Sequence, residues 1–450
     1  MKKFLLLLFF LLSISSHSLG FIRDSEIENI IKEIVGPIAD AAGQKKENLE
    51  IFIIDDDQLN AFVTPGQKIF IFSGLITNSK NANSLEGVIA HELGHITGRH
   101  HVKIYKQLEK SRAITLAGLI LGGAVSAITG DPDAAAAIAG GALTTSSRSL
   151  LSFTRAQEGA ADQAGYTFLK NSGKSLCGII SFLELLENMQ VSYQENAYTQ
   201  SHPLTRERIR DAKNAAKDEN CKSNNKTKKH GEIKNAELSI DEKYKFIQAK
   251  LIGFTDPENT LSSIKNNSKF NDDQKNYALA IANYKSFNLQ KGNELINKLI
   301  KKYPYNPYFY ELKAQMLREN GFLKESLNSY LIVNKLLPND PLVQIELAHT
   351  LINLDSKKNL DKAIQTLLAA KKKEPENNKL WYLLSVAHGK NSEMGKSRYA
   401  SAYSSYLNGD DAMAISFIER AKKITKKDSP IWNKLIDLEN KINLKKNKRR

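Results

Sequence analysis

Cysteine is scarce in this 450-residue chain, which has only two, too few for a disulfide framework or a four-thiolate zinc site. Proline (11 residues) and glycine (25 residues) are too few for a collagen-like or low-complexity chain. Hydrophobic residues make up 41% and charged residues 25%, ordinary values that argue against wholesale disorder and against a polytopic membrane protein. Because one compact core rarely holds a chain of this length, we expect two or three domains.

Acidic residues are fewer than basic ones, and the formal net charge is +15. A nucleic-acid-binding protein usually gathers its basic residues into one patch. Here the lysines are spread over a background rich in asparagine and lysine. We therefore interpret the charge as a compositional bias and expect no nucleic-acid partner.

The N-terminal 20 residues have the pattern of a secretory signal peptide. Two lysines precede an apolar run over residues 4–12, and small residues suit cleavage after Gly20. The apolar run is too short to span a bilayer comfortably. Export leads to a compartment in which disulfides can form, so Cys177 and Cys221 are either paired or two independent thiols, and the sequence leaves both open.

Hydrophobic periodicity predicts the elements of the N-terminal half. In chain order these are a helix over 22–42, a strand over 50–54, a strand over 67–73 after a turn at 64–66, a long helix from Ser84 to about residue 106, and helices over 153–169 and 178–190.

Residues 113–130 contain no charged side chain, which reaches the length of a membrane-span candidate. Glycine, threonine and serine dilute the hydrophobicity of this segment, and residues 134–151 are a weaker candidate because they include Arg148. Glycine- and alanine-rich faces also permit close helix packing. We favour a helical hairpin over 113–151 that packs on its domain or touches a membrane surface, rather than a true transmembrane hairpin.

The C-terminal half carries a repeat, after a polar linker at 213–235. Pro304 and Pro338 are 34 residues apart and Pro375 follows after another 37, with small residues such as Ala314 and Ala348 recurring between them. Small residues let two antiparallel helices approach, and a proline closes each unit. The pattern resembles the tetratricopeptide repeat, a helix pair of about 34 residues, with four or five degenerate units.

A metal-binding motif lies in the helix that begins near Ser84. His91 and His95 are four residues apart, so both imidazoles lie on one helix face and can bind one metal ion. Two imidazole donors suit Zn²⁺, which in a catalytic site needs a third protein ligand and an open position for water. Glu92 can reach that water and take its proton. His100 and His101 follow the motif, and we expect them to be exposed.

A third ligand is expected from another helix, where Glu158 and Asp162 share a face. Glu158 could complete the zinc site. Asp162 could accept the outer N–H of a ligating histidine and so hold its tautomer.

These features resemble the secreted branch of the HtpX and CAAX-protease superfamily of zinc metallopeptidases. Four segments match in order, spanning residue 24 to about 215: Asn60-Ala61-Phe62-Val63-Thr64-Pro65-Gly66 before an expected edge strand, the His-Glu motif, the Arg-x-x-Glu-x-x-Ala-Asp helix at 155–162, and Ser201-His202-Pro203 followed by Arg208-Ile209.

The resemblance implies one Zn²⁺ per chain, bound by His91, His95 and Glu158, with Glu92 as general base in a gluzincin-type HExxH endopeptidase. It also makes His202 a catalytic candidate, which either donates to the oxyanion or occupies the open zinc position. Arg208 would assist the oxyanion or anchor its loop to an acidic group. The edge strand would pair with the substrate main chain, with Asn60, Ala61, Phe62 and Val63 as substrate-binding residues.

The expected architecture is a signal peptide (1–20), an α+β zincin-type metalloprotease domain that is mostly helical with a small sheet (21–212), a linker (213–235) and an all-α tetratricopeptide-repeat solenoid (236–445). By resemblance, this is a periplasmic endopeptidase, which would be membrane-associated if the hairpin touches a membrane. It would act on unfolded or stalled outer-membrane β-barrel proteins, with repeats that recruit the β-barrel assembly machinery. The competing hypothesis is an envelope chaperone or scaffold in which proteolysis is minor.

Overall fold

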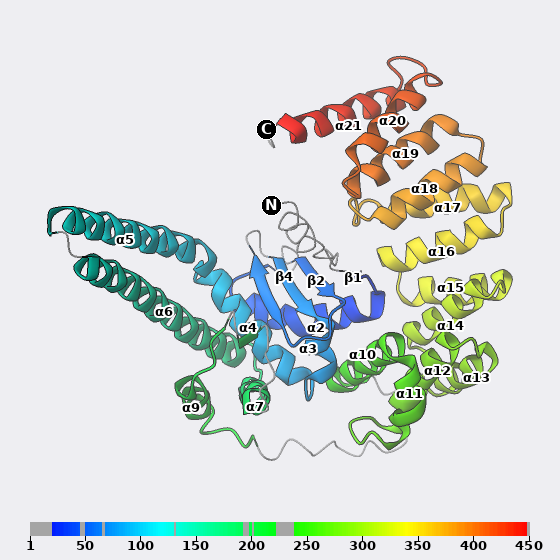
Figure 1. Ribbon diagram of the computed structural model, residues 1–450. Coiled ribbons are helices and arrows are strands. Elements are labelled where there is room, and N and C mark those ends of the chain that lie inside the picture. Colours follow the sequence, from blue (N-terminus) through cyan, green and yellow to red (C-terminus); the bar gives the residue numbers. More distant parts are fainter. Residues whose placement is uncertain are drawn as a thin grey trace, which may run out of the picture. The chain divides into compact units, whose positions relative to one another are not determined.

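The computed structural model describes residues 20–45, 50–64, 68–129, 132–191, 198–199, 202–221 and 238–447 (Figure 1). These residues divide into two compact units. The first unit runs to Leu251, except that Asp24–Glu26 belong to the second unit. The second unit otherwise begins at Ile252. The predicted signal peptide and most of the predicted linker lie outside the described residues.

The first unit contains a four-stranded sheet in the order β1-β2-β4-β3. Its strands are β1 (Phe21–Ile22), β2 (Glu50–Ile54), β3 (Ala61–Thr64) and β4 (Lys68–Phe72). The central strands β2 and β4 are parallel, while β1 and β3 pair antiparallel at the two edges. The expectation that residues 67–73 form the edge strand is therefore wrong. The edge is β3, which pairs with β4 through Ala61 opposite Ile71.

Alternation along the strands separates the two faces of the sheet. Ile69 and Ile71 of β4 are fully buried in the core, whereas Phe70 between them stacks between Phe52 and Phe62 on the other face. Helix α2 (Ser25–Ala41) contributes to the same core a stripe of isoleucines at helical spacing, namely Ile27, Ile31, Ile34 and Ile38. This core anchors the helix that carries the metal-binding motif.

That helix is α4 (Ala82–Thr97), preceded by the short helix α3 (Ser73–Asn78). The side chain of Asn81 caps α4 by accepting the backbone N–H of Ser84 at 3.0 Å. The helix ends at Thr97 and not near residue 106 as expected, because Arg99 adopts a left-handed conformation with φ of 51°. A new helix begins at His100.

The helices α5 (His100–Thr129) and α6 (Pro132–Asn171) run side by side as a long hairpin (Figure 1). Small residues meet at their interface, as at Gly118 and Ala142, and Ser146 donates to the carbonyl of Ser111 at 3.0 Å. The segments predicted over 134–151 and 153–169 are parts of the single helix α6. Within the described residues, no helix has the length and hydropathy needed to span a bilayer.

The helices α7 (Cys177–Val191) and α9 (Arg206–Ala215) complete the fold around the motif. Cys177, at the start of α7, forms a disulfide with Cys221, which follows α9. Of the two alternatives left open by the sequence, the structure shows the paired one. The bond closes a chain segment that includes both α7 and α9.

Replacing both Cys177 and Cys221 with serine is expected to destabilise the first unit by about 2–4 kcal/mol, because a bond across a sequence separation of 44 restricts the unfolded chain. Urea unfolding monitored by circular dichroism would measure the loss. Reduction of the parent chain should give the same shift in midpoint. An unchanged midpoint in both cases would contradict the stabilising role.

The boundary between the two units falls inside α10 (Ile240–Thr255), whose first part packs in the first unit. There the Tyr244 hydroxyl and the Gln248 amide both donate to the carbonyl of Ile76. The second unit therefore begins later along the chain than residue 236, where the sequence predicts the start of the repeats.

The second unit is a series of antiparallel helix pairs (Figure 1). After α11 (Pro257–Ser263) and a short 3₁₀ turn (Ile264–Asn266), the helices are α12 (Asp272–Lys285), α13 (Leu289–Lys302), α14 (Pro307–Glu319), α15 (Leu323–Leu336), α16 (Pro341–Asn353), α17 (Lys357–Ala370), α18 (Asn378–Lys390), α19 (Met394–Leu407), α20 (Asp411–Lys422) and α21 (Pro430–Asn447).

The sequence repeat corresponds to these pairs. Pro304, Pro338 and Pro375 each follow the second helix of a pair, and Ala314 and Ala348 are fully buried. The expected fold class, a mostly helical domain with a small sheet followed by an all-helical repeat, is confirmed.

Candidate metal centre

The two motif histidines lie on one face of α4, as their spacing predicts. Their Nε2 atoms are 3.0 Å apart, and both side chains are buried, with 1% exposure for His91 and 8% for His95. Two imidazole nitrogens this close, and turned toward one another, form one binding point for a cation.

Helix α6 approaches α4 closely because glycine stands at the contact. A Cβ atom on Gly94 would lie 2.6 Å from the carbonyl oxygen of Ala161, too near for any other residue. A Cβ atom on Gly165 would lie 3.2 Å from the backbone of Ala90, a tight but less severe contact. This packing brings the buried carboxylates of Glu158 and Asp162 to the histidines.

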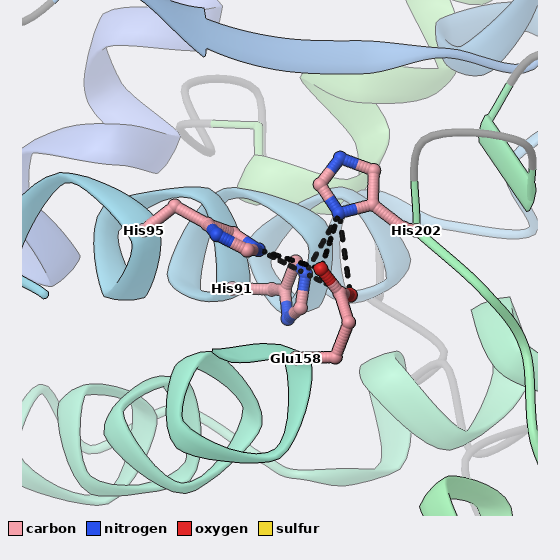
Figure 2. A group of neighbouring side chains, drawn as sticks. All are labelled: His91, His95, Glu158 and His202. Carbon is pink, nitrogen blue, oxygen red and sulfur yellow. Dashed lines mark hydrogen bonds and ion pairs between the residues drawn. The ribbon is translucent and has the colours of Figure 1, made fainter. Parts of the chain in front are cut away.

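Figure 2 shows the resulting group of His91, His95, Glu158 and His202. One ligand atom from each residue lies within 4.8 Å of all the others. The Glu158 carboxylate is 3.4 Å from the Nε2 atoms of both His91 and His95. His202 Nδ1 is 3.3 Å from both oxygens of Glu158 and 3.4 Å from His91 Nε2. The structure thus brings together all three predicted ligands and His202.

A second layer of charged residues holds this group. Asp162 accepts from His91 Nδ1 at 2.8 Å, which leaves the Nε2 lone pair directed into the site. Arg208 binds Asp162 through Nε at 2.7 Å and Nη2 at 2.9 Å, and its Nη1 lies 3.0 Å from Glu158. Arg208 thus pairs with two buried carboxylates and ties α9 to α6.

These contacts shift the titration of the buried groups. Burial by itself lowers the pKa of His91, but the hydrogen bonds with Asp162 and Glu158 outweigh it and raise the pKa to about 9. Below that pH, a metal ion would have to displace a proton from Nε2 of His91 in order to bind there. Burial and the neighbouring His91 lower the pKa of His95, so His95 stays neutral. Burial opposes the charged form of Glu158, yet hydrogen bonds with His202 and His91 keep its pKa well below the usual range.

Glu92 is fully buried beside this group. Among the described residues, neither of its carboxylate oxygens has a hydrogen-bond partner, and His202 Nε2 lies 3.6 Å from one of them. Burial raises the pKa of Glu92. An unsatisfied buried carboxylate is costly, and such groups are typical of catalytic positions.

The donors present fit zinc. Two imidazole nitrogens and a carboxylate are the ligand set of many catalytic zinc sites, and they converge here in the buried interior of the first unit. The orphaned Glu92 oxygens lie where a hydrogen-bond donor, such as a water at the metal, would satisfy them.

Two aromatic side chains near the site were not singled out by the sequence. Tyr198 stacks on His202 with ring centroids 4.5 Å apart, and its carbonyl accepts from the His202 N–H at 2.7 Å. His100, expected to be exposed, is only 6% exposed, and its Nδ1 lies 2.9 Å from His95 Nδ1. That expectation was wrong, because the chain turns at Arg99 and directs the His100 ring back toward α4. The structure does not describe the side chain of His101.

The predicted substrate-binding segment lies in and just before the edge strand. Ala61, Phe62 and Val63 belong to β3, which packs against α4, and the Asn60 carbonyl accepts from the Phe72 N–H at 3.0 Å. Ala61 is buried, whereas Phe62 and Val63 are partly exposed.

The fold and the histidine–glutamate group are typical of a metallopeptidase domain, and comparison with known families agrees. Residues 22–216 match the model of Peptidase family M48. Among curated proteins, the beta-barrel assembly-enhancing protease of Escherichia coli (strain K12) is 30% identical over 200 residues, which cover 44% of this chain and 41% of that protein.

This match spans about two fifths of the length of the Escherichia coli relative. The protein of the same name from Yersinia pestis is 22% identical over 413 residues, covering 90% of this chain and 81% of that protein. Among solved structures, that of yeast Tom70 has 13% identity and a TM-score of 0.37 over 96% of this chain and 82% of the other.

Proposed function

We propose that the chain is a zinc-dependent endopeptidase of the cell envelope, with His91, His95 and Glu158 binding one Zn²⁺ and Glu92 acting as general base. The observation that carries the proposal is the convergence of these three donors beside a buried carboxylate whose oxygens lack hydrogen-bond partners among the described residues. The match to the M48 family supports the same chemistry.

Zinc, when bound, lowers the pKa of a water molecule and polarises the scissile carbonyl. Glu92 takes one proton from the attacking water as the new C–O bond forms. Its burial and raised pKa suit it to hold that proton and then deliver it to the amine as the C–N bond breaks. Asp162 and Arg208 keep His91 in the required tautomer throughout.

We assign His202 to a resting state of the site. Its Nδ1 lies among the ligand atoms and its Nε2 faces Glu92, so the imidazole occupies the space that a substrate carbonyl and water would need. Stacking on Tyr198 holds it there. Displacement of His202 by substrate would then open the site. This favours the blocking role over the oxyanion role.

The substrate main chain would add to the sheet beside β3, since this strand has a free edge in the described sheet and packs against α4. Asn60, Ala61, Phe62 and Val63 would line the bound segment. Main-chain pairing depends little on the sequence of the substrate, so unfolded or stalled envelope proteins are suitable substrates. The relatives are named beta-barrel assembly-enhancing proteases, which supports β-barrel proteins as clients. The proposed periplasmic location depends on the signal peptide predicted from the sequence.

The helix pairs of the second unit would recruit partners such as the β-barrel assembly machinery, because stacked helical repeats present extended protein-binding surfaces. The competing function is that of an assembly scaffold. Complementation of cells that lack this protein distinguishes it from proteolysis. Full rescue of envelope assembly by a Glu92→Gln variant would favour the scaffold.

Changing His91, His95 or Glu158 to alanine should abolish stoichiometric zinc binding, because each is one of only three proposed protein ligands. Metal analysis of the purified variants measures this, with circular dichroism to confirm folding. The matched control is His349→Ala, a histidine of the repeats on α16. One zinc per chain in the folded variants would contradict the ligand assignment.

The α5–α6 hairpin would contact an anionic membrane surface. Leu116, Leu119, Ile120 and Leu121 of α5 are each at least half exposed, in a stretch without charged residues. Exposed basic residues precede this stretch on α5, namely Lys103, Lys106, Lys110 and Arg112. Aliphatic side chains next to a basic segment are typical of helices that lie in the lipid interface.

A Leu116→Glu/Ile120→Glu double variant should bind phosphatidylglycerol vesicles about tenfold more weakly in a sedimentation assay, because two aliphatic anchors are lost. Half-molar salt should weaken binding by the parent chain, because it screens the basic residues. The control is Leu331→Glu/Leu368→Glu, which alters two exposed leucines of the repeats. Equal binding by both double variants would contradict the assignment.

A further inference from the structure

The junction between α4 and α5 folds a second histidine back onto the metal centre. Arg99 is in the left-handed region with φ of 51°, which reverses the chain after Gly98. The His100 ring then lies over Gly98, where a Cβ atom would be 2.3 Å from His100 Nε2. The left-handed turn at Arg99 directs the ring back toward α4, and the absence of a Cβ atom on Gly98 leaves room for it there.

In that position His100 contacts the outer nitrogen of a proposed ligand. His100 Nδ1 is 2.9 Å from His95 Nδ1, and the rings are nearly perpendicular at 83°. Both residues are buried, and the backbone carbonyl of His100 accepts from Gln157 of α6. The contact is on the side of the His95 ring opposite Nε2, so His100 is outside the group of ligand atoms.

One proton must lie between the two Nδ1 atoms for this contact to be a hydrogen bond. If His100 donated it, neutral His95 would carry its own proton on Nε2 and could not bind a metal there. If His95 donates it, the Nε2 lone pair is free. Only the second arrangement is compatible with His95 as a ligand.

We infer that His100 is a positioning residue of the metal centre, which accepts the Nδ1–H of His95 and holds its Nε2 toward the zinc. The inference rests on the proposed zinc site and adds to it a residue that plays for His95 the part that Asp162 plays for His91. The two supports differ, since a carboxylate paired with Arg208 holds His91 while a second imidazole holds His95.

The test compares two substitutions in the full-length mature chain. His100→Phe keeps a ring but removes the acceptor, and His100→Asn keeps an acceptor oxygen near the position of Nδ1. Zinc affinity is measured by competition with a chromogenic chelator, and thermal unfolding of the metal-free proteins reports packing. We expect His100→Phe to weaken zinc binding about 10- to 100-fold and His100→Asn to restore it to within about threefold of the parent.

The outcomes separate this inference from the zinc site itself. A parent chain that binds one zinc while His100→Phe binds it equally well would overturn the positioning role alone. Equal weakening by both variants would also overturn it, since packing and not the acceptor would then matter. A parent chain that binds no zinc would overturn the proposed function and the inference with it.

Discussion

Replacing Glu92 with glutamine is expected to lower kcat for cleavage of an unstructured protein such as casein by about 10²-fold or more, while one zinc stays bound. Glutamine preserves the size of the side chain but cannot accept the proton of the attacking water. Because Glu92 is not one of the proposed ligands, metal content should not change. Steady-state kinetics and metal analysis on the same preparation measure both quantities.

Glu86→Gln is the matched control for this experiment. Glu86 is also a buried glutamate of α4, but it pairs with Lys174 at 2.6 Å and not with the metal group. Its loss should affect stability and leave kcat near the parent value. Undiminished cleavage by the Glu92→Gln variant would contradict the proposed mechanism.

Replacing His202 with alanine should raise the turnover of unstructured substrates about tenfold, equivalent to removing a block worth about 1.4 kcal/mol. The increase is expected because His202 lies between the ligand atoms and Glu92 in the resting site. Zinc should remain bound through His91, His95 and Glu158. Initial rates at several substrate concentrations, with parallel metal analysis, measure the effect.

A fall in turnover of the His202→Ala variant would instead assign the residue to the oxyanion, and unchanged turnover would leave it with no part in the reaction. Self-cleavage of the variant during storage would be a further sign of a released block. The His349→Ala variant again serves as the histidine control.

The parts of the site that depend on local periodicity were predictable from the sequence. Two histidines four apart in a helix must share a face, whatever the rest of the chain does. The same holds for Glu158 and Asp162 on α6. Their spacing therefore identified the group, and the structure places these residues around one point.

The remaining features depend on a local reversal of the chain or on contacts between distant segments, and hydrophobic periodicity predicts neither. The helix break at Arg99 goes together with the His100–His95 contact, and it interrupts a pattern that reads as continuous helix. The strand β3 has only four residues and becomes an edge only when β4 inserts between it and β2. The Cys177–Cys221 bond likewise depends on how α7 and α9 pack.

Because α6 is one continuous helix, movement of the hairpin can change the position of a side chain in the candidate metal centre. Leu143 and Glu158 lie on one uninterrupted helix, about 22 Å apart at 1.5 Å per residue. A rigid helix passes tilt and translation along its axis. A force on the outer end of α6 would therefore move the Glu158 carboxylate, unless the helix bends between the two points. Anchoring the hairpin would therefore restrict the movement of one proposed zinc ligand, from a point far from the proposed site of cleavage.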